Sequence, residues 1–137
     1  MKVILIQGCP NVGKSSLFWE IHKNYVTSAN TEVEEIHNQK DFWGVYHIKE
    51  KKVLLNSWAD TLSVITGFRE FYHKNKAEGY DVLVTAIRSL SNSKLHKYVK
   101  EVYQSDCVEE FVIDLDKIGK KQSSQQIFEE YFIPIFS

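Results

Sequence analysis

Cysteine is scarce in this chain, whose 137 residues include only Cys9 and Cys107. Two cysteines do not make the disulfide framework that stabilises small secreted domains, so we expect a reducing setting. The sequence also has no apolar run of membrane-spanning length, and no charged segment followed by the short apolar stretch of a secretory leader. These absences predict a cytoplasmic protein without a membrane partner.

An excess of positive charge is absent as well, because 17 lysines and arginines stand against 18 aspartates and glutamates. Proteins that bind nucleic acid or anionic membranes through broad surfaces normally carry a basic excess. No nucleic-acid partner is therefore evident, and any phosphate-binding site has to be local. The five histidines show no spacing typical of metal ligands, so we expect no histidine- or cysteine-based metal centre.

Apolar runs alternate with amphipathic stretches, which predicts an α/β three-layer sandwich with a mostly parallel sheet, a β-hairpin insertion and a single domain over residues 1–137. The predicted strands cover about 3–6, 80–87 and 111–115, and a tight hairpin joins 42–48 to 51–56. Helices are predicted over about 14–24, from Asp60 or Thr61 to near Gly79, from Ser91-Asn92-Ser93 onward, and from the capping box Ser123-x-x-Gln126 to Pro134.

A phosphate-binding motif lies between the first predicted strand and the first predicted helix. The segment reads Gly8-Cys9-Pro10-Asn11-Val12-Gly13-Lys14-Ser15 and matches G-x-x-x-x-G-K-[ST], the P-loop or Walker A motif. Its glycines let backbone N–H groups converge on phosphate oxygens, and the loop leads into a helix N-terminus that favours negative charge. The motif predicts a site for a nucleoside triphosphate, ATP or GTP. The residues expected to bind it are Gly8, Cys9, Pro10, Asn11, Val12, Gly13, Lys14, Ser15 and Ser16.

Two side chains of this motif have distinct expected roles. Lys14 is expected to reach the β- and γ-phosphates, and the Ser15 hydroxyl is expected to bind Mg²⁺. A carboxylate at the end of a neighbouring strand usually completes such a site. Asp60 is the first candidate, both as a catalytic residue and as an Mg²⁺ ligand, although it is equally suited to cap the following helix. Asp116 is the second candidate.

Arginine is rare, since Arg69 and Arg88 are the only two in the chain. Arg88 comes at the end of a predicted buried strand, the edge at which open α/β sheets bind ligands. A guanidinium there can grip a phosphate group and stabilise its charge during transfer, so Arg88 is predicted to be catalytic. The alternative is a plain surface arginine, which is the reading we favour for Arg69 on its predicted helix.

The chain resembles two families of nucleotide-binding protein, each through different segments. The segment from Gly8 to Leu17 is similar to the first motif of Era-like and translation-factor-type GTPases, in which Pro-Asn-Val-Gly-Lys-Ser recurs. The chain departs from them after Asp60, because Ser63 stands where their Asp-x-x-Gly motif has glycine. It also lacks the Asn-Lys-x-Asp guanine reader.

The second resemblance spans most of the chain. Segments 57–62, 79–88 and 111–117 resemble those of bacteriophage deoxynucleoside monophosphate kinases. This resemblance implies that Arg88 contacts phosphate and that Asp60 lies in the region of the phosphoryl acceptor. Ala86 stands where the family has an acid before the arginine.

Three functions follow from these observations. The favoured reading is a minimal ATP-dependent nucleotide kinase with Mg²⁺ and a nucleoside monophosphate acceptor. The first alternative is a GTPase-like switch that acts on a protein partner. The second is a non-catalytic nucleotide-binding module, which the alanine at position 86 favours.

Overall fold

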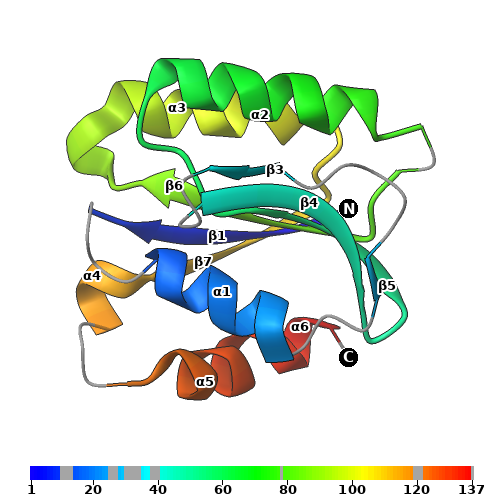
Figure 1. The fold of residues 1–137 in the computed structure, drawn as a ribbon. Coiled ribbons are helices and arrows are strands. Elements are labelled where there is room, and N and C mark those ends of the chain that lie inside the picture. The colour runs from blue at the N-terminus through cyan, green and yellow to red at the C-terminus, as the bar shows by residue number, and fades with distance from the viewer. Residues whose placement is uncertain are drawn as a thin grey trace.

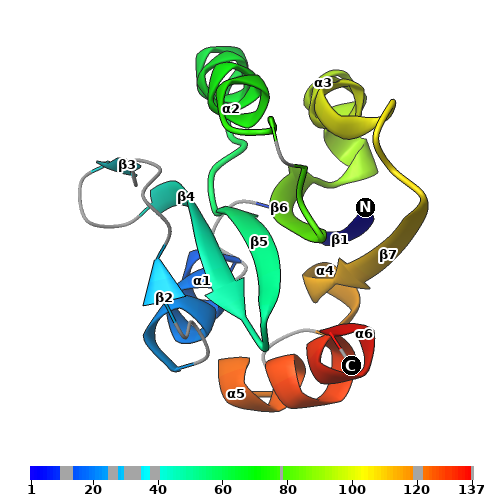
Figure 2. The same ribbon diagram turned by 90° about the vertical axis from the view of Figure 1, so that its right-hand side faces the viewer.

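The computed structural model describes residues 1–9, 14–24, 28–29, 35–37, 41–77, 79–118 and 122–136, with the backbone alone at 28–29 and 35–37. A seven-stranded sheet lies between two layers of helices (Figures 1 and 2). The strands are β1 (Lys2–Gly8), β2 (Ser28–Ala29), β3 (Glu35–His37), β4 (Asp41–Ile48), β5 (Lys51–Asn56), β6 (Val82–Arg88) and β7 (Glu109–Asp114). The helices are α1 (Lys14–Asn24), α2 (Leu62–Lys74), α3 (Ser93–Tyr103), α4 (Leu115–Ile118), α5 (Ser124–Ile127) and α6 (Ile133–Phe136), with a 3-10 turn η1 (Leu90–Asn92) and a π-helical turn η3 (Phe128–Phe132).

The sheet has a parallel centre and an antiparallel side. Its order is β2-β4-β5-β6-β1-β7, and β3 also pairs with β4. Strands β5, β6, β1 and β7 run parallel, whereas β4 runs antiparallel to β5. The predicted hairpin is confirmed, and Lys49 and Glu50 turn it with φ of 50° and 65°. Two successive residues with positive φ match the twist of a two-residue hairpin.

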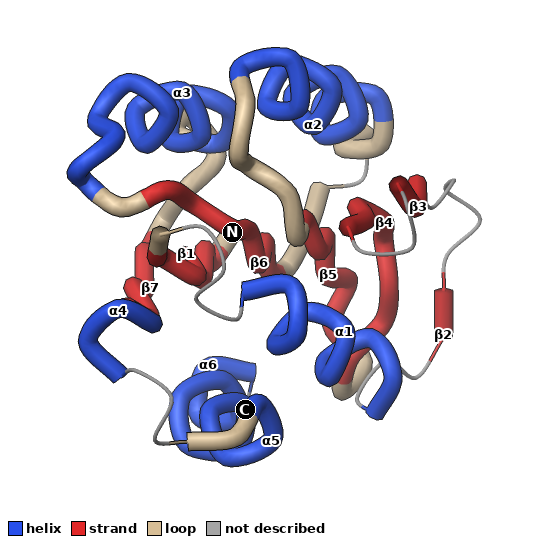
Figure 3. The backbone as a smooth tube through the Cα atoms, turned by 60° about the vertical axis from the view of Figure 1, so that its left-hand side comes forward, coloured by secondary structure: helices blue, strands red, loops and turns tan. Residues whose placement is uncertain are grey.

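Helices cover both faces of the sheet, as predicted. Figure 3 shows α2 and α3 side by side over one face, and α1, α5 and α6 over the other. The helices that follow β5 and β6 therefore lie on the opposite face from α1, which follows β1. The α/β three-layer sandwich with a mostly parallel sheet is confirmed, and the hairpin contributes β5 to the parallel part rather than standing apart from it.

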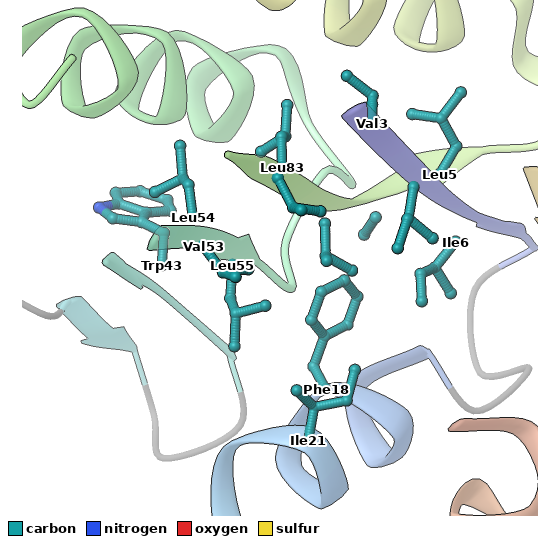
Figure 4. Close-up of a cluster of buried hydrophobic side chains, with 14 of the residues drawn as sticks. Val3, Leu5, Ile6, Phe18, Ile21, Trp43, Val53, Leu54, Leu55 and Leu83 are labelled. Carbon is teal, nitrogen blue, oxygen red and sulfur yellow. The ribbon is translucent and has the colours of Figure 1, made fainter. Parts of the chain in front are cut away.

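Apolar side chains form rows across the parallel strands. Leu54, Leu83 and Val3 occupy one register row and face α2 and α3, and all three are fully buried (Figure 4). On the other face Phe18 and Ile21 of α1 point toward the sheet. Burying a side chain of this size stabilises the fold by about 1.5–3 kcal/mol. The apolar runs of β1 and β6 are strands buried on both faces, whereas the edge strand β7 leaves Val112 exposed.

The start of α2 agrees with the prediction, which offered Asp60 or Thr61 as the cap, and its end differs. Thr61 caps the helix, because its side-chain oxygen accepts a hydrogen bond of 3.3 Å from the Val64 N–H. Asp60 is therefore not the cap. The helix ends at Lys74, with Asn75 at its C-cap, and not near Gly79 as predicted. A polar Asn75 whose N–H and side chain both bond the Phe71 carbonyl ends the helix before the glycine.

The last helical segment continues past Pro134, where the prediction ended it. Ser123 and Gln126 form the predicted capping box. The π-helical turn η3 ends at Phe132, two residues before the proline, and the Ile133 N–H donates to the Phe128 carbonyl five residues earlier. Proline lacks an N–H and clashes with the preceding turn of a regular α-helix. The widened turn offers a way past this conflict, so α6 continues to Phe136.

Gly44 in β4 makes room for the ring of Tyr46, and we predict that Gly44→Ala destabilises the protein. A Cβ at position 44 would lie 2.6 Å from the Tyr46 hydroxyl oxygen and 2.8 Å from its ring. Tyr46 is only 1% exposed, so the ring has little space to move and the cost should be about 1–3 kcal/mol.

Gly67→Ala is the control for this prediction. Its Cβ would lie 3.2 Å from Trp43, and alanine favours the α2 helix by about 1 kcal/mol, so a much smaller change is expected. Urea unfolding of both variants measures the difference. Equal stability of the two variants would contradict the prediction.

Candidate functional site

One edge of the sheet gathers the residues that the sequence singled out. The parallel strands β1, β6, β7 and β5 all end at this edge, and the antiparallel β4 begins there. The register pairs Gly8 at the end of β1 with Arg88 at the end of β6. The helices α1 and α3 leave these two strands toward opposite faces of the sheet (Figure 2), and open α/β sheets bind ligands at the strand ends where this happens.

Lys14 is the buried cation of the site. Its Nζ donates a hydrogen bond of 2.9 Å to the Gly8 carbonyl and lies 4.0 Å from a carboxylate oxygen of Asp60. The residue is only 7% exposed. Burial lowers the pKa of Lys14 below its ordinary value of 10.5, the charge of Arg88 lowers it further, and the carboxylates of Asp60 and Asp116 raise it. Two cations and two carboxylates therefore share one electrostatic environment.

Arg88 brings an unsatisfied donor to this environment. Its Nε–H is buried and has no hydrogen-bond partner among the described residues. The backbone at this position is held in place, because His96 Nδ1 lies 2.8 Å from the Arg88 carbonyl oxygen. A buried donor without a partner costs about 1–3 kcal/mol, which an anionic ligand would recover.

The Cys9 N–H of the P-loop motif already binds a carboxylate of the protein itself. The Cys9 N–H lies 3.2 Å from both carboxylate oxygens of Asp116, which belongs to the first turn of α4. Asp114 caps that turn by accepting from the N–H groups of Asp116 and Lys117. The contact demonstrates that this amide is oriented toward a negatively charged oxygen at the edge of the sheet.

The structure describes five of the nine predicted loop residues, and Pro10, Asn11, Val12 and Gly13 lie outside the described residues. Gly8, Cys9 and Lys14 come together as stated above. Ser15 is half-buried in the first turn of α1, and Ser16 is exposed. Both cysteines are free thiols.

Asp41 is a residue of this edge that the sequence analysis missed. The Ser15 hydroxyl donates a hydrogen bond of 2.9 Å to Asp41 Oδ1. Ser57, which follows β5, donates to the same oxygen at 3.2 Å. The signal in the sequence was positional: Asp41 directly precedes a hairpin strand, and the start of an antiparallel strand meets the ends of its parallel neighbours.

Two tryptophans flank this cluster. Trp58 follows Ser57 in the chain and stacks on Trp43 of β4, with ring centroids 6.2 Å apart and planes 25° apart. The backbone N–H of Trp58 donates to Asn56 Oδ1, and Asn56 Nδ2 donates to the Thr85 hydroxyl in β6. This chain of contacts ties the segment after β5 to the neighbouring strand.

The donor set fits phosphate and a hard cation. Lys14, Arg88 and the Cys9 amide supply positive charge and N–H donors. Ser15, Asp41 and Asp60 supply hydroxyl and carboxylate oxygens, the ligands that Mg²⁺ prefers. No group of three or more histidine, cysteine, aspartate or glutamate side chains placed to hold a metal ion occurs in the described part of the chain. A cation here would need phosphate oxygens or water as further ligands, which is usual for Mg²⁺.

Comparison with known proteins adds little to these observations. No protein-family model and no curated protein sequence matches the chain. A solved structure described as nucleolar GTP-binding protein 1 from Plasmodium falciparum is similar with a TM-score of 0.38 and 14% identity, over 91% of this chain and 81% of that one. A similarity at this level carries no argument about function. Within the described ranges, no helix has the length and apolar character needed to cross a membrane.

Because Lys14 is a buried charge, we predict that it lowers the free energy of unfolding of the protein without ligand. We expect Lys14→Met to raise the free energy of unfolding by about 0.5–2 kcal/mol, as other stabilising substitutions in binding sites do. The folded-state pKa of Lys14 is lowered, so the penalty is full below that pKa and fades as the pH rises toward 10.5. The stability gap between Lys14→Met and the parent protein should therefore narrow at alkaline pH.

Chemical denaturation of the two proteins from pH 7 to 10.5 measures this gap. Lys97→Ala, at a 76% exposed side chain on α3, is the control and should show no such pH-dependent gap. A Lys14→Met variant that is less stable than the parent, or a gap that does not change with pH, would contradict the assignment of Lys14 as a destabilising buried charge.

Proposed function

We propose that the chain binds a nucleoside triphosphate with Mg²⁺ at the edge formed by the ends of β1 and β6. The observation that carries the proposal is that buried Lys14 feels the charge of Arg88, whose Nε–H has no partner among the described residues. The P-loop sequence pattern begins with Gly8 and Cys9 at the end of β1, and the Cys9 N–H already faces a carboxylate. A triphosphate would supply the negative charge that both cations and this amide favour.

We further propose that the activity is phosphoryl transfer of the nucleotide kinase type in the cytoplasm, with a nucleoside monophosphate as acceptor. Lys14 binds the β- and γ-phosphates, and Arg88 stabilises the charge of the transferring group. Mg²⁺, when bound, neutralises charge on the phosphate oxygens, and Ser15 is one of its ligands. Asp60, 4.0 Å from Lys14 Nζ, keeps the lysine charged and oriented. This mechanism needs no covalent intermediate on the protein.

A non-catalytic nucleotide-binding module is the second candidate, and one observation favours it. Ala86, which stands where the kinase family has an acid, is fully buried, so no polar group projects from that position. A GTPase-like switch with a protein partner stays a third candidate. The three functions differ in base preference and in turnover, so ATP and GTP have to be compared with each other.

The binding proposal is tested by calorimetry with ATP and GTP in the presence of Mg²⁺. We expect one of the two to bind, Lys14→Ala to weaken binding by about 2 kcal/mol or more, and Arg88→Ala to weaken it as well. Lys97→Ala and Arg69→Ala replace exposed residues on α3 and α2 and should leave binding unchanged. Absence of heat with both nucleotides, confirmed by an unchanged melting temperature, would overturn the proposal.

Turnover separates the candidates. A kinase should consume ATP faster when a nucleoside monophosphate is added, and Arg88→Ala should slow this step by about 100-fold or more while Arg69→Ala does not. A binding module should show a nucleotide-dependent melting temperature without turnover. A switch should favour GTP and change its protease sensitivity between the diphosphate and the triphosphate.

Asp116 accepts the hydrogen bond of the Cys9 N–H, which a bound triphosphate would use. We therefore predict that Asp116→Asn strengthens triphosphate binding. Loss of the carboxylate charge beside Cys9 should gain about 1 kcal/mol in triphosphate affinity. Asp81→Asn, at an exposed position on the opposite edge of the sheet, is the matched control. Calorimetry with inorganic tripolyphosphate, with and without Mg²⁺, measures the effect. Weaker binding only in the presence of Mg²⁺ would instead identify Asp116 as a metal ligand.

A further inference from the structure

Asp41 accepts two hydroxyl hydrogen bonds on one of its carboxylate oxygens. Ser15 donates to Oδ1 at 2.9 Å and Ser57 donates to the same atom at 3.2 Å. None of the described residues donates to the other oxygen, Oδ2. Two hydroxyl oxygens and a half-buried carboxylate thus meet at the carboxyl edge of the sheet, and one of those hydroxyls belongs to the residue predicted to bind Mg²⁺.

The position of Asp41 is fixed by its neighbours. Ser57 is only 4% exposed, and its hydroxyl accepts a hydrogen bond of 2.8 Å from the Phe42 N–H while it donates to Asp41. The Ser57 N–H in turn donates to the Phe42 carbonyl at 2.9 Å. These bonds close the end of the β4–β5 ladder and hold the carboxylate beside the first turn of α1. A pre-positioned carboxylate loses little freedom when it binds a ligand.

We propose that Asp41 is the protein carboxylate that binds Mg²⁺ together with Ser15, and that Ser57 is the positioning residue that holds it. The proposal rests on the proposed binding of a nucleoside triphosphate. Mg²⁺ holds its oxygens at about 2.0–2.1 Å in an octahedral arrangement, which places adjacent ligand oxygens about 2.9 Å apart. Ser15 Oγ and Asp41 Oδ1 lie 2.9 Å apart, so both can bind one ion with little movement of the backbone.

Asp60 is less suited to this role than the sequence predicted. Its carboxylate lies 4.0 Å from Lys14 Nζ, and its side chain is 45% exposed. It therefore compensates the charge of the buried lysine. Thr61, and not Asp60, caps α2, so the Asp60 carboxylate is available for Lys14. Asp41 is thus assigned to Mg²⁺, and Asp60 is assigned to the ammonium group of Lys14.

The test compares nucleotide affinity with Mg²⁺ and with EDTA, by calorimetry, in the full chain. We expect Mg²⁺ to strengthen binding to the parent protein, and Asp41→Asn to reduce this Mg²⁺-dependent gain by about tenfold or more without weakening metal-free binding. Asparagine keeps an oxygen that can accept from Ser15. Asp60→Asn should keep the Mg²⁺-dependent gain. Electron paramagnetic resonance of Mn²⁺ with the bound nucleotide, as a second readout, should show fewer protein-bound ions in Asp41→Asn.

Each outcome has a distinct meaning. No nucleotide binding by the parent protein overturns the proposed function itself. Mg²⁺-dependent binding that persists in Asp41→Asn, or is lost in Asp60→Asn instead, overturns only the assignment of Asp41, and so does nucleotide binding that Mg²⁺ never strengthens. If circular dichroism shows that Asp41→Asn fails to fold, Ser57→Ala decides, because it keeps the carboxylate and removes its holding hydroxyl. An unchanged Mg²⁺-dependent gain in a folded Ser57→Ala variant overturns the role of Ser57, and with it the positioned Asp41 site.

Discussion

The parallel pairing of β1 with β6 is the constraint on which the rest of the site depends. It places Gly8 beside Arg88, and the chain returns to the same place with Lys14 at the start of α1. Burial lowers the pKa of the lysine, the charge of Arg88 lowers it further, and the two cations would repel each other without compensation. The pairing therefore brings positive charge from two segments to one end of the parallel strands.

Carboxylates from three other segments lie at the same end of the sheet, and two of them, Asp60 and Asp116, oppose the charge of the lysine. Asp60 follows β5, Asp116 begins a short helix after β7, and Asp41 opens β4. They reach the same edge because parallel strands end together and an antiparallel neighbour begins where they end. Each takes a different partner: an ammonium group, a backbone amide and a pair of hydroxyls. The three aspartates therefore differ in role because each has a different hydrogen-bond or ion-pair partner.

The sequence predicts the elements that hold this edge far better than it predicts the partners of its side chains. The apolar runs, the hairpin, the helix opened by Ser91-Asn92-Ser93 and the capping box of Ser123 and Gln126 depend on local patterns, and the structure confirms them. Asp41 could not be found in this way, because its contact with Ser15 depends on strand order, which local patterns do not encode. The continuation past Pro134 was missed because its compensation, a π-helical turn, leaves no composition signal.

The stacked pair of Trp43 and Trp58 gives the molecule a built-in optical probe. Trp58 is bonded directly to Ser57, whose hydroxyl touches Asp41, and its indole lies against that of Trp43. Indole emission responds to small shifts in distance and polarity. A movement of Asp41 away from its serine partners would take place one peptide bond from Trp58, so indole fluorescence can report on it in solution without an added label.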